Sequence, residues 1–580
     1  MMPRYMRTLA RAACIAAVTW CATGPVAVHA IALNYGELTG SFDTTLSWGM
    51  SVRTQDQETI PTSIYGQREL FPDAWDIITH QVKASHELEL RNSQWGDATW
   101  GLFLRGNYFY DFEMANQPLP DAAENRAEQH GDITDAFVWF RFGPDDRLML
   151  RVGKQVISWG ESTFFQGSIN EINTVDFTKL RQPGSAIKDA FIGVRSIYGQ
   201  WEVTPVVTLE AFYLLEFQEL LLDPVGNFFG TNDRVRDGGG FPNGIGPSVG
   251  GQFDGCLTPD SAKYAAVGIN VGCSFGPITR IGDDIPSGSG QYGVALRWFA
   301  ADFLSGFDFG FYYQRLHDRN GYLSTIVGGT PSVFGPAPMS PRYFMDYARG
   351  VDRFGFSFNT EVGGWAIGGE LGYRHNEPTQ NAQALLAAPL DGILGAPTGA
   401  FGPVGSKFVG YERFKRYQYQ MTFQRNFGPV AWARTDQFQF LAEMAYGWVE
   451  DFPDTKIDGG GNIVFSKFNP VSKDWSAVQI RTSQEYNRAL FNFVNVRFEQ
   501  ALAWDIDGVS TEISPLFRED RKRFTLGFRF SWLDSYSASI SHTWDWGGED
   551  HRRPGPPLSN GGGIFNPVED FLRMNFSYSF

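Results

Sequence analysis

The sequence predicts a transmembrane antiparallel β-barrel of about 18 strands (about 16–18), with long extracellular loops and short periplasmic turns. Three observations support this fold class. The chain of 580 residues is rich in aromatic residues and glycine, with 50 Phe, 22 Tyr, 17 Trp and 65 Gly. It contains no run of eighteen apolar residues, which excludes a helical membrane protein. Apolar and polar residues alternate along segments of about ten residues, the length that a tilted strand needs to cross a bilayer.

The clearest alternation lies between residues 522 and 546. Small or polar residues separate the apolar ones on both sides of a tight turn at Leu533 and Asp534. A helix of this sequence would place Trp and Ser on every face, so helices are excluded. A soluble β-sandwich would also alternate, but with shorter strands and a polar outward face. The residues at the apolar positions are Phe524, Leu526, Phe528, Phe530, Trp532, Tyr536, Ala538, Ile540, His542, Trp544 and Trp546.

Eighteen segments of this kind occur in the sequence, and the connections between them alternate strictly between long and short. This alternation is typical of outer-membrane barrels and predicts that both chain ends lie in the periplasm. Strand parity assigns charges of both signs to the inner face, among them Glu370, Glu443, Arg529 and Arg573. The predicted strands are 41–53, 80–91, 98–112, 132–142, 147–157, 191–201, 206–217, 290–299, 304–315, 351–362, 365–375, 411–425, 436–449, 478–487, 491–505, 522–532, 535–546 and 570–580.

Residues 1–30 have the pattern of a secretory signal peptide, which leaves residues 31–580 for the barrel. Arg4, Arg7 and Arg11 precede a short apolar stretch, and small residues at Val28 and Ala30 favour cleavage after Ala30. Cleavage after Ala32 is a second possibility. An uncleaved anchor helix is the alternative, but the apolar stretch is too short to span a bilayer.

The end of the chain has the pattern of a terminal barrel strand. Apolar residues occupy every second position back from a terminal Phe, as in outer-membrane barrels of Gram-negative bacteria, whose assembly machinery binds this strand. We therefore expect outer-membrane lipid and the barrel assembly machinery as partners. The predicted assembly signal consists of Leu572, Met574, Phe576, Tyr578 and Phe580.

Two cysteines outside the predicted signal peptide, Cys256 and Cys273, lie seventeen positions apart in a segment rich in Gly and Pro. In an exported protein this pair predicts a disulfide in the longest extracellular loop. A metal or redox pair is the alternative, but it lacks the C-x-x-C spacing and nearby histidines. No metal site and no cofactor are expected.

The third long connection, residues 158–190, is crowded with polar groups and contains three phenylalanines that need burial. Folded into the lumen, it would form a pore constriction, because narrow pores select by charged and hydrogen-bonding walls. A packed external loop, stabilised by turns and caps, is the alternative. The predicted constriction residues are Trp159, Glu161, Asn170, Asn173, Asp176, Lys179 and Arg181.

Charge and motifs exclude other classes of function. The net charge of −16 argues against a nucleic-acid partner, since phosphate binding needs a basic surface. A glycine fingerprint at Gly288, Gly290 and Gly293 precedes a strand and not a helix, so it does not indicate a dinucleotide site. Because no other enzyme motif is present, catalytic residues are not expected, although outer-membrane enzymes exist.

Residues 151–184 carry a motif: Gly153-Lys154-Gln155, Trp159-Gly160-Glu161, Asn170, Asn173, Asp176 and Pro183-Gly184. It resembles the signature of domain-of-unknown-function family 1302, outer-membrane proteins of Gram-negative bacteria. Lys154 departs from the Arg that is more usual there. The resemblance implies no catalytic residues. It implies an RND-type exporter and a periplasmic or lipoprotein component as partners, and hydrophobic compounds such as steroids and lipids.

The sequence therefore predicts a channel or transporter in the outer membrane that passes or hands over small hydrophobic or amphipathic compounds. The substrate class comes from the family resemblance and not from composition. A structural or assembly role in lipid transport, with a plugged lumen, is the first alternative. An outer-membrane enzyme is the second.

Overall fold

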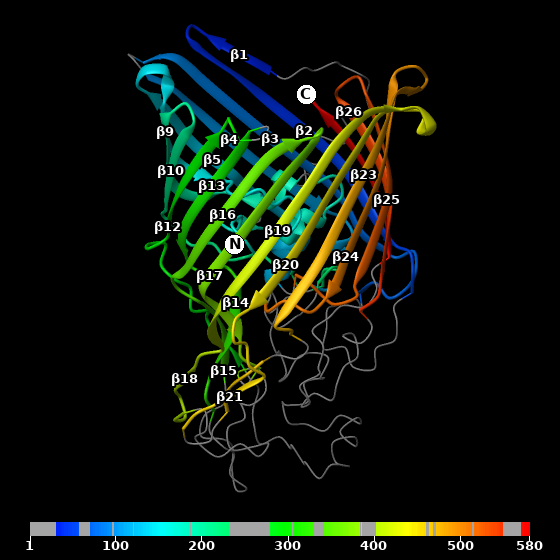
Figure 1. Ribbon diagram of the computed structural model, residues 1–580. Helices are drawn as coiled ribbons and strands as arrows, with labels where there is room; N and C mark the ends of the chain where they lie inside the picture. Colours follow the sequence, from blue (N-terminus) through cyan, green and yellow to red (C-terminus); the bar gives the residue numbers. More distant parts are fainter. Residues whose placement is uncertain are drawn as a thin grey trace.

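The chain forms a closed antiparallel β-barrel of 18 strands (Figure 1). This computed structural model describes residues 31–56, 70–95, 98–119, 121–185, 187–224, 226–230, 279–303, 306–328, 342–382, 384, 402–459, 463–467, 471–512, 516–548 and 570–580. The predicted signal peptide, Cys256 and Cys273 lie outside these residues. In the described part of the chain, the helices are all too short or too polar to cross a membrane.

Each barrel strand pairs with the strands before and after it in the chain, and β27 pairs with β2 to close the ring. The barrel strands are β2 (Leu38–Arg53), β3 (Ile77–Trp95), β4 (Ala98–Asp111), β5 (Gln129–Phe142), β6 (Leu148–Gln155), β9 (Val194–Thr204), β10 (Val207–Leu214), β12 (Tyr292–Ala300), β13 (Phe307–Leu316), β16 (Val351–Val362), β17 (Trp365–Gln380), β19 (Tyr411–Val430), β20 (Thr435–Val449), β23 (Asp474–Leu490), β24 (Val494–Asp507), β25 (Lys522–Trp532), β26 (Tyr536–Trp546) and β27 (Phe571–Ser579).

The eighteen predicted strands are confirmed, with differences at their ends. β19 continues to Val430, through half of the predicted turn 426–435, and β23 begins at Asp474, four residues before its predicted start. β10 ends three residues early, at Leu214. Alternation locates a strand by its two faces, but the backbone pairing continues where a neighbouring strand still offers partners, so the ends follow the register.

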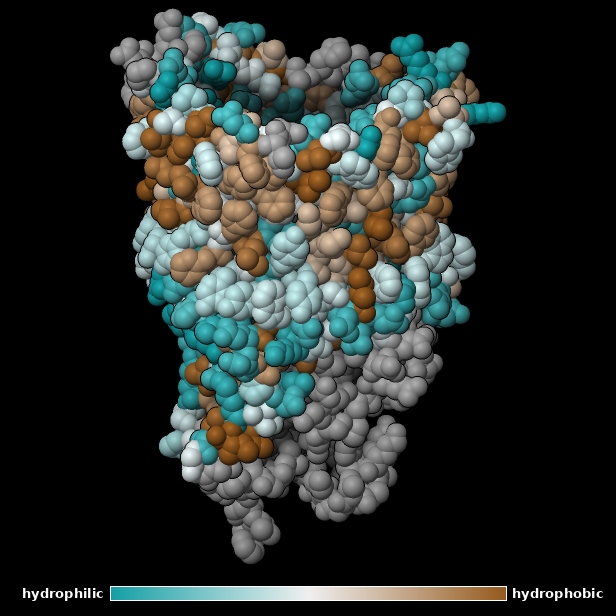
Figure 2. Space-filling model, viewed as in Figure 1, coloured by the Kyte–Doolittle hydropathy of each residue, from teal (hydrophilic) through white to brown (hydrophobic). Residues whose placement is uncertain are grey.

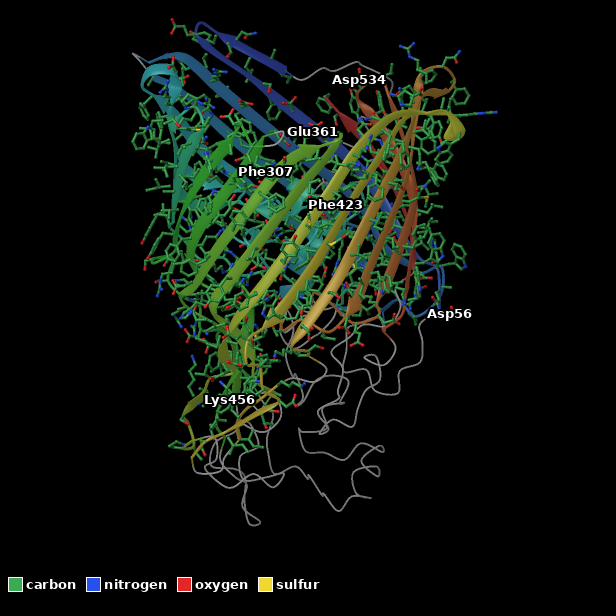
Figure 3. All side chains as sticks on the ribbon, in the orientation of Figure 1. Asp56, Phe307, Glu361, Phe423, Lys456 and Asp534 are labelled. Carbon is green, nitrogen blue, oxygen red and sulfur yellow. The ribbon has the colours of Figure 1, made fainter. Side chains whose placement is uncertain are left out.

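The short turns gather at one end of the barrel and the long connections at the other. Asp534 lies at the short-turn end and Lys456 at the long-loop end (Figure 3). At the short-turn end, β1 (Ile31–Tyr35) pairs with β2 on the same edge as β27. The two chain segments therefore lie one after the other along a single strand.

A smaller sheet projects from the long-loop end (Figure 1). It consists of β11 (Thr279–Arg280), β15 (Arg342–Tyr347), β14 (Gly321–Ile326) and β18 (Lys407–Phe408). The remaining elements are short, namely β7 (Thr174–Val175), β8 (Phe191–Ile192), β21 (Thr455–Ile457), β22 (Ile463–Ser466), α2 (Asp121–Ala127), α3 (Phe177–Arg181), α4 (Ile187–Ala190), η2 (Met114–Asn116), η3 (Pro144–Asp146) and η7 (Ala431–Ala433).

The outward face of the barrel is apolar. Figure 2 shows hydrophobic residues over the wall near the short-turn end, with hydrophilic residues toward the long-loop end. Outward aromatic rings contact one another across strands: Trp365 lies edge-on to Phe427 and Phe440, with centroids 5.9 and 5.7 Å apart. Such cross-strand aromatic pairs stabilise a sheet by burying ring area between neighbouring strands.

Candidate pore constriction

Residues 156–193, here called the inner loop, join β6 to β9 and cross the inside of the barrel. Its first half hydrogen-bonds to β10, β13, β16, β17, β19 and β20. Its second half reaches β3 and β27. These two groups of strands lie on opposite sides of the ring, so the loop spans the lumen. Its teal ribbon is visible between the barrel strands in Figure 1.

The base of the inner loop is fixed by Trp159 and Asn173. Asn173 accepts the Ile157 N–H at 2.9 Å and donates its amide to the Ile157 carbonyl at 2.7 Å, which clamps the two arms of the loop together. The Trp159 indole donates to Glu210 at 2.6 Å, and its ring packs on Phe212 with centroids 4.8 Å apart. Trp159 is 1% exposed, so it anchors the loop to the wall and does not line a passage.

Two motif glycines let the loop lie against the wall. Gly160 has φ +90°, and a Cβ there would lie 2.4 Å from the Glu370 carboxylate. Gly184 has φ +71°, and a Cβ there would lie 2.0 Å from the Asn575 side chain. Only glycine combines this backbone conformation with such close approach. The motif glycines therefore mark two points where the backbone of the inner loop approaches the barrel wall closely, at β17 and at β27.

Two wall carboxylates hold the tip of the inner loop. Glu370 accepts the N–H groups of Glu161 at 2.7 Å and Ser162 at 3.1 Å. Glu443 accepts the N–H groups of Thr163 and Phe164, both at 2.8 Å. It also accepts the Phe165 N–H and the Ser162 hydroxyl. The tip is therefore held by the side chains of two wall residues, which together accept hydrogen bonds from residues 161–165.

Next along the loop, Glu171 binds two arginines of the same wall, on β16 and β17. Its carboxylate lies 2.6 Å from Arg374 and 3.3 Å from Arg353. Burial opposes ionisation of this carboxyl, but the charges of Arg374, Arg353 and Arg416 outweigh it and lower the pKa of Glu171 to about 2. Glu171 is therefore a permanent anion that ties the loop to β16 and β17.

The second half of the loop is a folded scaffold. Asp176 caps α3 by accepting the N–H of Thr178 at 3.0 Å and that of Lys179 at 3.3 Å. Burial lowers the pKa of Lys179, and the carboxylates of Asp176 and Asp132 oppose this effect only in part. Arg181 pairs with Asp223 and donates to the Phe229 carbonyl. Asp176 therefore stabilises the loop from within, whereas Lys179 and Arg181 join it to Asp132 on β5 and to Asp223 and Phe229 of the next long connection.

Glu161 and Asn170 complete the predicted set. The Glu161 carboxylate accepts from Asn359 at 3.0 Å and lies 3.9 Å from Arg297. Burial raises the pKa of Glu161, while Asn359 and Arg297 oppose that rise. Asn170 donates to the Phe165 carbonyl at 3.3 Å inside the loop. The structure thus brings Glu161 to the barrel wall and leaves Asn170 in the loop's own hydrogen-bond network.

The inner loop leaves part of the lumen uncovered. The inward residues Gln418, Gln420 and Glu443 on β19 and β20 are each no more than 1% exposed. On β24 and β25 the inward side chains Glu499 and Arg529 are 41% and 52% exposed. The free part of the lumen therefore lies between the loop and the wall of β23 to β26.

The loop meets this free space at Thr163, which is exposed, and at Phe164. The guanidinium carbon of Arg481 on β23 lies 4.6 Å from the centre of the Phe164 ring. From the sequence, Phe164 was expected only to need burial, and Thr163 and Arg481 were not singled out. The parity of strand 478–487 places Arg481 on the same face as Gln479 and Ser483, so its inward direction was readable. The contact between Arg481 and Phe164 could not be predicted, because strand parity gives no information about partners in a loop.

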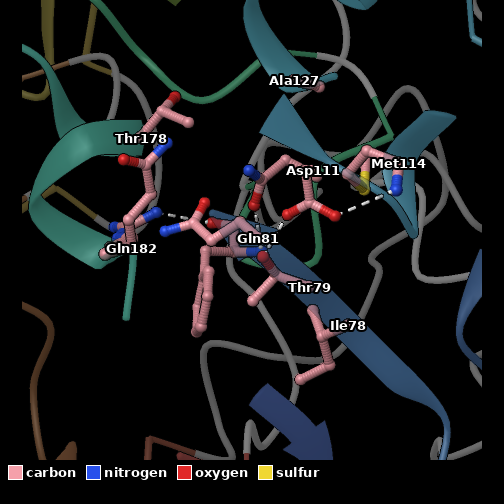
Figure 4. A pocket seen from close by; sticks show the side chains of 11 residues that line it. Ile78, Thr79, Gln81, Asp111, Met114, Ala127, Thr178 and Gln182 are labelled. Atoms are coloured by element: carbon pink, nitrogen blue, oxygen red, sulfur yellow. Dashed lines mark hydrogen bonds between the residues drawn. The ribbon is translucent and has the colours of Figure 1, made fainter. Parts of the chain in front are cut away.

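A small pocket lies beside β3 and β4 near the long-loop end (Figure 4). Its carboxylate, Asp111, already accepts the N–H groups of His80 at 3.1 Å and Glu113 at 3.0 Å, as well as the Thr79 hydroxyl. The pocket therefore offers no free charge to a ligand. Within the ranges that the structure describes, no group of His, Cys, Asp or Glu could hold a metal ion.

The molecule is thus an 18-stranded β-barrel with one connection folded across its lumen. The chain belongs to the family described as "Protein of unknown function (DUF1302)", whose model matches residues 9–580. The predicted resemblance is confirmed. No curated protein matches the sequence.

Several solved outer-membrane proteins have a similar fold. OpdK from Pseudomonas aeruginosa is 10% identical, with 93% of this chain and 98% of that chain covered and a TM-score of 0.42. A BenF-like porin from Pseudomonas fluorescens Pf-5 gives the same identity, coverage and TM-score. OccAB1 from Acinetobacter baumannii is 9% identical, with 93% and 96% covered and a TM-score of 0.42.

Proposed function

We propose that the protein is an outer-membrane channel for small hydrophobic or amphipathic compounds of the lipid or steroid kind. The observation that carries the channel function is the contrast between the two inner walls. The inner loop buries inward residues of β19 and β20, whereas the wall of β24 and β25 presents water-exposed charged side chains inside a closed barrel. An inward wall of this kind, behind an apolar outer face, is what an aqueous passage through a bilayer requires.

The outward aromatic and aliphatic residues support a location in the outer membrane, with the short turns in the periplasm and the long loops outside the cell. An exported chain with a cleaved segment 1–30 fits this location. A partner at the periplasmic end, such as an RND-type exporter with a periplasmic or lipoprotein component, belongs to the same proposal and rests on the family resemblance alone. A catalytic role is not proposed, because the sequence contains no enzyme motif that would indicate a nucleophile and its base.

Planar-bilayer recording tests the channel function directly. The purified, folded protein should insert from detergent and produce discrete conductance steps, and proteoliposomes should take up small solutes. A heat-denatured sample is the matched control, because it contains the same chain and detergent without the barrel. Absence of steps from a folded, inserted protein would contradict the proposal.

The alternative is a structural or envelope-assembly role with a plugged lumen. The many hydrogen bonds between the inner loop and β13 to β20 favour this alternative, because a loop held in this way behaves as part of the wall. The two functions differ in one measurement. A plugged barrel conducts only after the inner loop has been shortened, whereas a channel conducts with the loop intact.

A further inference from the structure

Short side chains line the wall opposite the tip of the inner loop. At one level of the barrel, Arg481 on β23 pairs in register with Ala501 on β24, which pairs with Thr525 on β25. Thr525 pairs with Thr543 on β26. All four residues point inward, because neighbouring residues of paired strands share a face. Arg481 is exposed and Ala501 and Thr525 are partly exposed, whereas Thr543 is buried, so the free space in front of this wall lies beside β23 to β25.

On β27, at the far side of this small-residue wall, Arg573 pairs in register with Ser541. Its guanidinium donates to the Arg181 carbonyl at 2.7 Å and lies 5.0 Å from the Phe571 ring centre. Arg481 and Arg573 thus flank the passage from its two sides, with the rings of Phe164 and Phe571 beside them.

The two flanking arginines differ from the other inward arginines of this region. Arg523 pairs with Asp545 at 2.5 Å, Arg497 with Glu485 at 2.8 Å, and Arg529 lies 3.8 Å from Glu499. Within the described ranges, neither Arg481 nor Arg573 has a carboxylate at ion-pair distance. Arg481 is exposed, and Arg573 is partly buried beside the Arg181 carbonyl, so these two guanidinium groups, without a carboxylate at ion-pair distance, give this region positive potential.

We infer that Arg481 and Arg573 form the selective constriction of the passage, and that it recognises amphipathic organic anions with a carboxylate head and an apolar or aromatic body. The inference rests on the proposed channel function and names its substrate class. A guanidinium fork binds a carboxylate with two parallel hydrogen bonds. The Phe164 ring lies beside one such fork and offers an apolar surface for the body of the same solute.

Ion selectivity tests the charge of the constriction. In a KCl gradient the wild-type channel should be anion-selective, and the double variant Arg481→Gln with Arg573→Gln should lose most of that preference. A change in the permeability ratio of about threefold or more is expected, because charge at a narrow site dominates passage. Arg497→Gln is the matched control, since Arg497 also faces inward but is paired with Glu485. Selectivity that is the same in the wild type and the double variant would overturn the inference.

Ligand binding tests the chemistry of the head group. 4-Phenylbutyrate, its uncharged amide and 4-phenylbutylammonium have the same ring and chain, and each can be titrated by calorimetry into the protein in detergent. Only the carboxylate should bind, and Arg481→Gln should weaken it about tenfold, or about 1.4 kcal/mol. Arg481→Lys should restore anion selectivity but only part of the affinity, since an ammonium cannot make the bidentate pair.

The two measurements separate failure of the site from failure of the channel. Equal binding of the carboxylate and the amide, in a protein that conducts, overturns the anion site and leaves the channel function standing. Arginine-dependent binding of 4-phenylbutyrate by a folded protein that does not conduct overturns the channel function and supports the anion site.

Discussion

Glu443 is a single inward residue that holds the tip of the inner loop. It accepts three backbone N–H groups and one hydroxyl from four consecutive residues of the inner loop, 162–165. Strand parity correctly predicted that Glu443 and Glu370 face inward. It could not predict what they bind, because the donors lie more than 200 positions away in a segment without periodicity. The sequence therefore predicted that these anchoring side chains face inward, but not which groups of the loop they bind.

Replacing Glu443 by Gln should loosen the tip of the inner loop. The amide keeps the size of the side chain but loses its charge and one of its two acceptor oxygens. Hydrogen bonds to charged groups contribute about 1.5–3 kcal/mol, so the tip should become mobile and single-channel currents larger and noisier. Glu361→Gln is the control, since Glu361 is an inward acid of β16 that is exposed near the short-turn end (Figure 3). Identical current traces for the Glu443 variant and the wild type would contradict this role.

Glu171 gives a prediction about pH. Its pKa is lowered from 4.5 to about 2, so folding favours the ionised form. The stabilisation is then complete above about pH 4.5 and is lost as the pH falls toward 2. The difference in melting temperature between wild type and Glu171→Gln should therefore shrink as the pH falls from 5 toward 2. Taking the difference cancels the titration of carboxyl groups that do not interact with Glu171, and a difference that stays the same from pH 5 down to pH 2 would be inconsistent with this pairing.

At the scale of elements, the inner loop divides into a tip and a scaffold. Sequence reasoning proposed seven residues for the constriction, but Trp159, Asn173 and Asp176 fix the loop internally or to the wall. The same residue types build turns, caps and pore linings, and a sequence does not distinguish these uses. Whether the loop narrows a pore stays a prediction.

Shortening only the tip tests that prediction without unfolding the scaffold. Replacing residues 162–168 by a short Gly-Ser linker removes Phe164 and the donors to Glu443, and keeps Glu161, Ile169 and the clamp at Asn173. Single-channel conductance should rise, because the part of the loop that faces the free wall is gone. A variant that folds normally and conducts like the wild type would place the tip outside the conducting path.

The strands were predictable and the smaller sheet at the long-loop end was not. A barrel strand has one outward and one inward face, so its composition alternates and reveals it. Residues 322–325 of β14 and 343–347 of β15 are buried on both sides, so they show no alternation. Such short buried runs, which contain polar residues such as Ser324 and Asp346, cannot be told from loop residues by periodicity.

At the scale of the whole molecule, the barrel is held closed by the pairing of its first and last barrel strands. Nine residues of β27 pair with β2, and the Phe580 backbone exchanges two further hydrogen bonds with Thr44, at 2.6 and 2.8 Å. The predicted assembly residues Leu572, Met574, Phe576 and Tyr578 all lie in this seam.

Deleting Phe580 should therefore lower the amount of folded protein in the outer membrane and induce periplasmic stress. The terminal residue contributes both hydrogen bonds at the end of the seam and the aromatic group expected to be bound during assembly. Folded barrel can be quantified by its altered gel mobility without heating. Phe580→Tyr, which retains the ring, is the control, and unchanged levels after deletion would argue against the assembly signal.

The arrangement of β1 and β27 has a consequence for chain connectivity. Ile31 lies opposite Phe42 and Phe580 opposite Thr44, and both segments run in the same direction along β2. Only the position opposite Asp43 separates them, so one added residue would splice Phe580 to Ile31. A circular permutant opened between Gly363 and Gly364, in a two-residue turn, would then keep every strand neighbour while its last residue is no longer Phe580. In the natural chain order, the last strand both closes the barrel and carries the carboxyl-terminal assembly signal. In the permutant, the closed barrel would be kept while that signal would no longer stand at the chain end.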